Sequence, residues 1–480
     1  MSETNLIEEI AAVEEISARA AVRQGDLTQG PILRTLLLFS VPTLFANVFQ
    51  TLGGTINMIW VGQLLGEGAV AATANSNLIV FLAFATVFGF GMATTVKVGQ
   101  YYGARDMLQM RRAFGTGAGF CTATAVIGST LGWIFADPVL RLLATPGSIH
   151  DEALSYLRVS FLLMPIGTFS MMISMGLRGI GDAKTPLYTM ILTTVLGIIF
   201  NPVLILGLGP FPRLGIAGSA WALLLAQAFS LSATIAWIYA RDLPLRLRGR
   251  ELLFLLPLVD ELRYVVVKGL PMGAQTLVAS SSALIMVGLV NREGMMTSAG
   301  YGAVLQIWNY IQMPSFAVSM AVSAMVAQNI GAAQHDRANA ITVAGVVSNT
   351  IFTTLLTVLL LALDGPLLNL FLGHGSPAVP IAERIQLLST WGWIISGAMM
   401  ILSGTMRAYG VVVLPLIIMT ISLFAARLGF YAVTYPVLGA DSLWWAYPFG
   451  SIMALVLTLW AYVRPGWRKD QLVAAPAPAE

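Results

Sequence analysis

The chain has 480 residues, of which 57% are apolar or aromatic and 10% are charged, whereas soluble domains carry roughly 25% charged residues. Together with a mean hydropathy of +0.79, this composition excludes a soluble globular protein, and a net charge of +3 is too small for a nucleic-acid binder. The single cysteine, Cys121, excludes an intramolecular disulfide and a cysteine-rich metal site. The remaining class is a polytopic membrane protein.

The first segment, 1–33, is predicted to be a cytoplasmic amphipathic segment and not a signal peptide. Leu6, Ile7, Ile10 and Val13 recur at helical spacing. Glutamates crowd the region where a targeting sequence is basic and then apolar. A solvated tail helix and a docked regulatory helix both fit this pattern.

Apolar segments long enough to cross the ~30 Å hydrocarbon core follow, and they predict an all-α membrane protein. They lie near residues 36–61, 70–96, 113–135, 159–177, 186–208, 216–239, 269–290, 298–326, 340–363, 387–406, 411–435 and 443–463. These twelve transmembrane helices form two six-helix lobes, 34–239 and 269–463. A cytoplasmic linker, 240–268, joins the lobes, and a cytoplasmic tail, 464–480, ends the chain.

The distribution of basic residues predicts the orientation. The tails and the even-numbered loops contain 20 Lys and Arg residues, and the opposite loops contain five. Because basic loops stay in the cytoplasm, we expect both termini there and the protein in the inner (plasma) membrane. The one remaining basic residue, Arg427, lies inside the eleventh span.

The chain contains an internal repeat with an offset of 227–229 residues. Its landmarks form four pairs, each with one member in each half: Pro42 with Pro271; Gln100 to Ala104 with Gln328 to Ala332; Asp137 to Leu140 with Asp364 to Leu367; and Arg178 to Pro186 with Arg407 to Pro415. Each half has an even number of spans, so the halves have the same orientation. We expect pseudo-two-fold symmetry along the membrane normal, which suits a transporter whose lobes rock about a central cavity.

These landmarks resemble the multidrug and toxic compound extrusion (MATE) family. The segments that carry the resemblance are Pro42 to Gly66, Gln100 to Asp106, Leu177 to Pro186, Asn201-Pro202, Leu214 to Ala222, Ala327 to Ala332 and Arg407 to Gly410. The resemblance covers about 34–464. It implies a two-lobe fold and cation-driven export of small organic compounds such as drugs, toxins or metabolites by alternating access. The wider superfamily also contains flippases of lipid-linked oligosaccharides.

The sequence departs from this family at its carboxylates. All 23 acidic residues fall outside the predicted spans, so no buried carboxylate is expected. Many members of the family carry acids in spans one and five, where this chain has Asn57 and Asn201. An amide does not exchange a proton near pH 7, whereas a carboxyl group with a raised pKa does. Amide oxygens still ligate a hard cation, which makes Asn57 and Asn201 a candidate Na⁺ site. The coupling ion, H⁺ or Na⁺, stays open.

Two helix faces form the candidate polar site of the N-terminal lobe. Asn47, Gln50 and Asn57 share a face of the first span, and Thr193 and Asn201 share a face of the fifth. Hydrogen bonding between helices is the alternative role for such residues.

The C-terminal lobe supplies further substrate-binding candidates: Gln275, Ser282, Gln306, Asn309, Tyr310 and Arg427. The guanidinium of Arg427 stays protonated, so it either meets an anionic substrate, snorkels, or pairs with an acid at a helix end. Pro202 and Pro314 lie inside spans and are hinge candidates.

Other function classes fit less well. A flippase for lipids or lipid-linked oligosaccharides is the main alternative, but it needs a large cationic cavity. An enzyme is not expected, since His150, His335 and His374 all lie in loops and no catalytic grouping is apparent. No phosphate-binding loop is present, which argues against ATP-driven pumping. We expect no cofactor, no catalytic metal and a monomer whose partners are organic substrates and membrane lipids.

Overall fold

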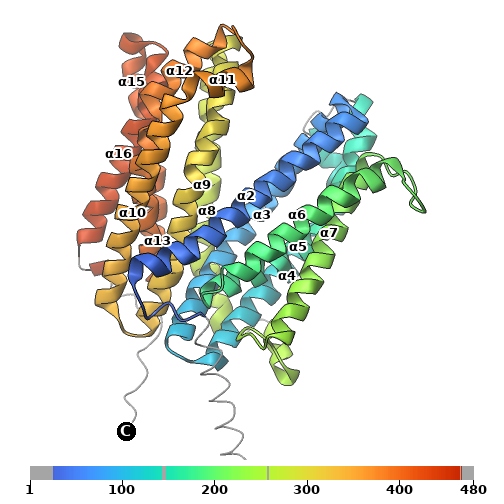
Figure 1. Ribbon diagram of the computed structural model, residues 1–480, viewed down its shortest axis with the longest axis vertical. Coiled ribbons are helices and arrows are strands. Elements are labelled where there is room, and N and C mark those ends of the chain that lie inside the picture. The colour runs from blue at the N-terminus through green and yellow to red at the C-terminus, as the bar shows by residue number, and fades with distance from the viewer. Residues whose placement is uncertain (1–24, 143–146, 257–258, 465, 468–480) are drawn as a thin grey trace, which may run out of the picture. The chain divides into compact units, whose positions relative to one another are not determined.

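The computed structural model describes residues 25–142, 147–256, 259–464 and 466–467. Most of the predicted amphipathic segment 1–33 and of the tail 464–480 lies outside these residues. Within them, all regular elements are helices (Figure 1).

Each predicted span overlaps a helix or a run of short helices. The first half contains α2 (Ile32–Leu65), α3 (Glu67–Gly103), α4 (Met107–Leu142), α5 (Gly147–Gly179), α6 (Lys184–Leu206) and α7 (Ile216–Ala240). A 3₁₀ segment, η1 (Gly249–Leu255), lies in the linker. The second half contains α8 (Val259–Arg292), α9 (Met295–Gly331), α10 (His335–Ala362), α11 (Asp364–Leu372), α12 (Ala378–Ser389), α13 (Gly392–Ala408), α14 (Val413–Thr420), the π-helix η2 (Ile421–Leu428), α15 (Gly429–Leu438) and α16 (Asp441–Val463).

Several helices are longer than the spans. For example, α5 and α8 begin at Gly147 and Val259, well before the predicted 159 and 269, because an apolar window detects only the lipid-facing part of a helix. Within the described ranges, ten helices are long and apolar enough to cross a membrane, and the bent pair of α12 and α13 makes an eleventh. The predicted span 70–96 is part of α3, a 37-residue helix that is not among these ten.

The internal repeat is confirmed in the helix lengths and turns. The helices α2 and α8 each have 34 residues, and α3 and α9 each have 37. Arg105 and Ala333, which follow α3 and α9, both have a positive φ. Gly181 and Gly410, which follow α5 and α13, also share a positive φ, a conformation that glycine adopts without strain. The two halves therefore repeat the same local geometry.

The halves differ in how often their helices are interrupted. Three helices of the first half are unbroken, and the repeat offset shows their counterparts in the second half to be divided. The helix α4 corresponds to α10 and α11, and α5 corresponds to α12 and α13. The helix α6 corresponds to α14, η2 and α15. The axes of α12 and α13 meet at 45°. A π-helix is rare and widens the backbone spiral, often at functional sites. By contrast, α6 and α9 continue unbroken through the hinge candidates Pro202 and Pro314.

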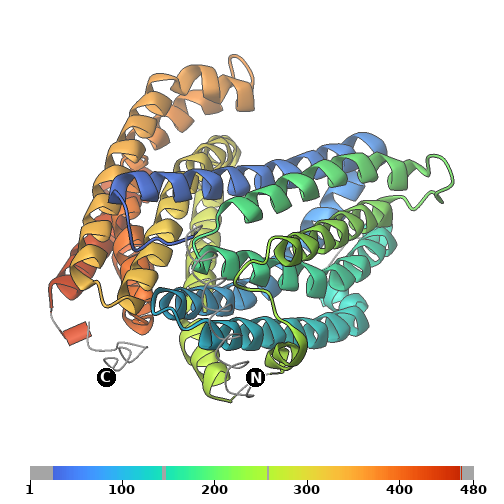
Figure 2. The same cartoon turned by 60° about the horizontal axis from the view of Figure 1, so that its bottom comes forward.

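The chain divides into two compact units. The first contains Phe45–Leu270, and the second contains Gly30–Leu44 and Pro271–Ala474. In the second unit, α9, α10, α13 and α16 pack side by side (Figure 1). In the first unit, α3, α4, α5 and α7 pack side by side, with α6 against α7 (Figure 2).

The structure corrects one expectation about charge. The carboxylate of Glu261 is buried in the first turn of α8, where Lys97 Nζ of α3 lies 3.3 Å from its Oε2. The Tyr101 hydroxyl donates to Oε1 of the same carboxylate at 3.3 Å. The prediction that no carboxylate is buried was wrong because the apolar window placed both charges in loops. The long helices instead bring them together as a pair, which reduces the free-energy cost of burying either charge alone.

Candidate functional site

The first compact unit contains a small cavity between α2, α6 and α7, whose mostly apolar wall includes six polar side chains. Its volume is about 150 Å³, which is room for several waters or a partly hydrated ion. Its polar lining residues are Gln50 and Asn57 from α2, Thr193, Thr194 and Asn201 from α6, and Gln227 from α7. None of these described lining residues is acidic or basic.

A local contact between α2 and α6 lies at the cavity. A Cβ atom at Gly53 would lie 3.3 Å from the Thr194 hydroxyl oxygen, so glycine lets the two helices approach. The Thr194 hydroxyl donates a 3.1 Å hydrogen bond to the carbonyl oxygen of Phe49. This contact fixes the register in which the asparagine faces of the two helices meet.

The two asparagines have different surroundings. Asn57 is buried, and its Oδ1 accepts a 2.7 Å hydrogen bond from the Ser219 hydroxyl of α7. Asn201 is 2% exposed and donates from Nδ2 to the Gly197 carbonyl at 2.9 Å. The buried Oδ1 of Asn201 has no hydrogen-bond partner among the described residues. An unsatisfied buried oxygen is costly, and this one belongs to a residue that lines the cavity.

The structure brings together four of the five residues that spacing predicted for this lobe, namely Gln50, Asn57, Thr193 and Asn201. Asn47 is half-buried on α2 and does not line the cavity. Sequence reasoning missed Ser219 and Gln227. Ser219 lies in the quoted segment Leu214 to Ala222, and Gln227 is an amide in the middle of an apolar helix, which is the signal that could have found it.

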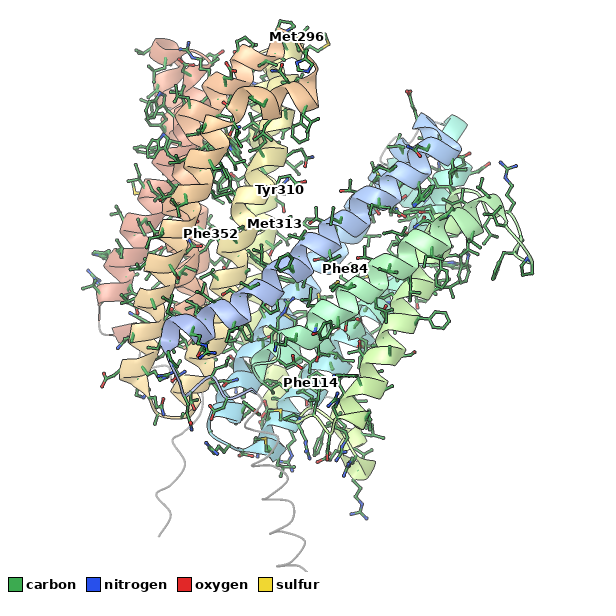
Figure 3. All side chains as sticks on the ribbon, in the orientation of Figure 1. Phe84, Phe114, Met296, Tyr310, Met313 and Phe352 are labelled. Atoms are coloured by element: carbon green, nitrogen blue, oxygen red, sulfur yellow. The ribbon has the colours of Figure 1, made fainter. Side chains whose placement is uncertain are left out.

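The candidates of the C-terminal lobe fall into separate environments. Gln275 donates from Nε2 to the Val412 carbonyl at 3.3 Å. Ser282 is fully buried, and its hydroxyl has no hydrogen-bond partner in the described part of the chain. The remaining three candidates of this group, Gln306, Asn309 and Tyr310, are exposed on one face of α9. Figure 3 shows Tyr310 and Met313 along the same flank of α9.

Arg427 lies in the π-helix η2 and is 9% exposed. Its guanidinium carbon is 4.4 Å from the ring centroid of Tyr447, within cation–π range. Among the described residues, no acid forms an ion pair with it, and its buried Nε has no hydrogen-bond partner. A Cβ atom at Gly450 would lie 3.3 Å from this Nε, so glycine makes room for the side chain.

An aromatic cluster surrounds Tyr447 and connects to an acid outside the spans. The Tyr447 hydroxyl is hydrogen bonded to that of Tyr301, and the Tyr447 ring centroid lies 4.8 Å from that of Trp308. The Trp308 indole donates to the Thr390 hydroxyl at 3.0 Å, and this hydroxyl donates to Gln386 Oε1 at 2.9 Å.

The chain of hydrogen bonds ends at Asp364, the first residue of α11. Its Oδ1 accepts from Gln386 Nε2 at 2.9 Å. Burial of the carboxyl group, opposed by this hydrogen bond and reinforced by the nearby charge of Glu383, raises the pKa of Asp364 to about 6.

The sequence of this chain is similar to a family model and to several known proteins. The family model described as MatE matches residues 42–203 and 271–431, one copy in each half of the repeat. The chain belongs to the MATE family. A Bacillus subtilis protein described as "Probable multidrug resistance protein YoeA" is 32% identical over 92% of this chain and 95% of its own length. A Shewanella oneidensis protein described as "FAD transporter" is 26% identical over 72% of this chain and 75% of its own.

The fold agrees with this assignment. The crystal structure described as "MATE in complex with MaL6" superposes with a TM-score of 0.83 at 20% identity, covering 94% of this chain and 99% of that one. The protein therefore has the all-α MATE fold of twelve helices in two lobes. It is a multi-pass membrane transporter of the multidrug-efflux type.

Proposed function

We propose that this MATE transporter exports small organic compounds by alternating access in exchange for a cation, and that the cation binds in the cavity of the N-terminal lobe. The observation that carries the proposal is the cavity lining, which has no charged group among the described residues and includes Asn57 and the buried Asn201, whose Oδ1 has no hydrogen-bond partner. Oxygen atoms of amides and hydroxyls are the ligands of a hard cation.

The lining favours Na⁺ over H⁺ as the ion bound in this lobe. Neither amide exchanges a proton near neutral pH, so the site has no proton-accepting group. A neutral site also binds a cation less tightly than one with a carboxylate, because the ion receives no full counter-charge in a medium of low dielectric. We therefore propose sodium coupling that saturates only at high Na⁺ concentration.

Purified protein in proteoliposomes tests this, with the Na⁺ and H⁺ gradients imposed separately. Export should follow the Na⁺ gradient and respond weakly to the H⁺ gradient. Asn57→Asp or Asn201→Asp should make export pH-dependent, because either restores a titratable group. Asn47→Asp, on the same helix but outside the cavity, is the matched control. Export driven by the proton gradient alone in the unmodified protein would contradict the proposal.

A specific observation supports a second proposal, on substrate class. Arg427 is a buried cation without an acidic partner among the described residues, and such charges inside a membrane protein are by default functional. The relative described as an FAD transporter acts on an anionic compound. We infer that substrates with a phosphate or carboxylate group draw Arg427 out of its aromatic packing.

Export of FAD and of a cationic dye by the same vesicles separates the substrate classes. Arg427→Gln should lower FAD export and spare the dye, and Arg427→Lys should retain part of the FAD export. Equal effects on both compounds would exclude a role in selecting anions. In the cell we place both termini and the linker in the cytoplasm and the lobes in the inner membrane, on the 20-to-5 count of basic residues.

A further inference from the structure

The linker between the lobes is packed against α4 along a glycine face. A Cβ atom at Gly115 would lie 2.7 Å from the Cβ atom of Phe254, and one at Gly119 would lie 1.8 Å from the carbonyl oxygen of Leu255. Both distances are too short for any residue with a side chain. The segment η1 therefore lies directly on the backbone of α4.

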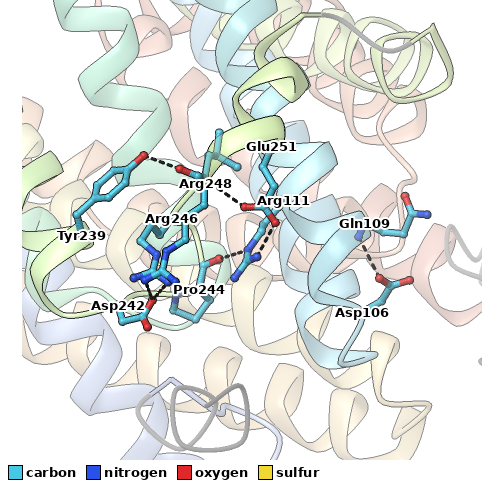
Figure 4. A network of polar contacts seen from close by, with 10 residues as sticks. Asp106, Gln109, Arg111, Tyr239, Asp242, Pro244, Arg246, Arg248 and Glu251 are labelled. Atoms are coloured by element: carbon cyan, nitrogen blue, oxygen red, sulfur yellow. Dashed lines mark hydrogen bonds and ion pairs between the residues drawn. The ribbon is translucent and has the colours of Figure 1, made fainter. Parts of the chain in front are cut away.

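Polar contacts hold the linker in this place (Figure 4). Arg111 of α4 donates from Nε to the Pro244 carbonyl at 3.0 Å and from Nη1 to Glu251 Oε1 at 2.7 Å. The second carboxylate oxygen of Glu251 accepts from the Arg248 backbone N–H at 2.9 Å. Glu251 and Arg111 thus neutralise each other, and Asp242 forms ion pairs with Arg246 and Arg248.

An apolar groove of about 440 Å³ opens where η1 ends. It is lined by Thr122, Ala123, Val126 and Ile127 of α4, Phe169 of α5 and Leu255 of η1. The Thr122 hydroxyl is the polar group of this lining, and it has no hydrogen-bond partner among the residues that the structure describes. A groove of this kind accepts a hydrocarbon chain, with a hydrogen-bond donor at its wall.

Two arginines without acidic partners among the described residues belong to α4 and η1, two of the elements that line the groove. Arg112 is on α4, with its guanidinium carbon 5.5 Å from the ring centroid of Phe254, the residue before Leu255. Its Nε is buried and lacks a hydrogen-bond partner within the described ranges. Arg250 is exposed on η1, and no ion pair of the described residues includes it.

Three leucines of the linker also face outward. Leu252, Leu253 and Leu256 are between 50% and 65% exposed. Leucines next to arginines in one short segment are typical of a surface that lies at the boundary between lipid headgroups and acyl chains. The proposed orientation places this segment at the cytoplasmic leaflet, which carries the anionic lipids that attract arginine.

We propose that this is a binding site for one anionic phospholipid, with an acyl chain in the groove between α4 and α5 and the phosphate beside Arg112 and Arg250. Such a lipid anchors the linker to the N-terminal lobe, because it contacts η1 and α4 at once. The site lies wholly within the first compact unit and does not share residues with the cation cavity.

Native mass spectrometry of the full-length transporter, delipidated and titrated with phosphatidylglycerol or phosphatidylcholine, tests the proposal. One phosphatidylglycerol should be retained in preference to phosphatidylcholine. Arg112→Gln and Arg250→Gln should each weaken this retention about fivefold, the equivalent of the ~1 kcal/mol that a basic side chain contributes at an anionic surface. Ala123→Trp, at an exposed groove position, should displace both lipids.

Arg241→Gln is the matched control, because Arg241 is an exposed arginine at the start of the same linker that stacks on Trp237 at 4.7 Å, away from the groove. Equal retention of the two lipids would overturn the proposal, and so would an equal loss in Arg241→Gln, which would indicate diffuse surface charge. Arg250 is exposed and without an ion pair, so its replacement leaves the fold intact and keeps the test decisive. Lipid retention is measured without transport and is independent of the coupling ion.

Discussion

Replacing Arg427 by methionine should make the protein more stable and a poorer transporter of anions. The side chain is 9% exposed, and its Nε lacks a hydrogen-bond partner among the described residues. Burying an ion costs several kcal/mol even after relaxation. The cation–π contact with Tyr447 is shielded from water and offsets about 2 kcal/mol of this cost. Methionine is a flexible apolar side chain that removes the charge, so the free energy of unfolding should rise by about 1–4 kcal/mol, the range for buried ion pairs replaced by apolar residues.

Thermal unfolding in detergent, followed by tryptophan fluorescence, measures this change. Arg384→Met is the control, because Arg384 forms an exposed ion pair with Asp441 and such pairs contribute at most about 1 kcal/mol. The Arg427→Met variant should unfold at a higher temperature than the wild type, and the control should not. A lower unfolding temperature for Arg427→Met would refute the reasoning and would make Arg427 a structural residue of η2.

Three further changes test other parts of the structure. Gly119→Ala should displace the linker from α4, since its Cβ atom would lie 1.8 Å from the Leu255 carbonyl oxygen, and trypsin should then cut the linker faster. Ser219→Ala should lower the free energy of unfolding by about 1–3 kcal/mol, because it leaves the buried Oδ1 of Asn57 without its donor. Asp364 has a pKa raised to about 6 by burial, so the folded state binds its proton more tightly than the unfolded state, whose pKa is 3.8. Stability then falls as the pH rises through this window, and Asp364→Asn should unfold at a higher temperature than the wild type at pH 7 but not at pH 4.

Each of these tests has a matched comparison. Gly128→Ala, on the same helix, places its Cβ atom in open space and should leave proteolysis unchanged. Ser232→Ala removes an exposed hydroxyl that bonds only within its own helix and should leave stability unchanged within about 0.5 kcal/mol. For Asp364, a variant that unfolds at the same temperature as the wild type at both pH values would show that the carboxyl group carries no such penalty.

The sequence was sufficient for most of the fold and for the N-terminal cavity. Spacing on two helices predicted that Asn57 and Asn201 contribute to one polar site, and both line the same cavity, because helical periodicity is regular and the apolar spans set the frame. It did not identify Gln227, because a single amide on a third helix has no partner at a fixed spacing. The pairing of Lys97 with Glu261 depends on helices that extend beyond the apolar windows, which hydropathy alone does not detect.

The interruptions of the second half could not be predicted in the same way. Neither the bend before Gly392 nor the π-helix around Arg427 begins at a proline, and the apolar pattern runs through both. Tertiary contacts accompany both: Gly450 of α16 admits the Arg427 side chain, and the Thr390 hydroxyl at the bend accepts a hydrogen bond from Trp308. Contacts between distant segments decide such features, and a single sequence does not reveal them.

The helices of the C-terminal repeat copy are interrupted more often than those of the N-terminal copy. This difference bears on how the two halves of a duplicated protein take different roles. A continuous helix moves as one rigid body, whereas a helix with a bend or a π-helical segment changes shape locally at that point. Three continuous helices of the N-terminal copy, α4, α5 and α6, correspond to interrupted helices in the C-terminal copy. A common origin has therefore not kept the two copies equally continuous, and we expect local deformation of these helices to concentrate at the breaks of the C-terminal copy.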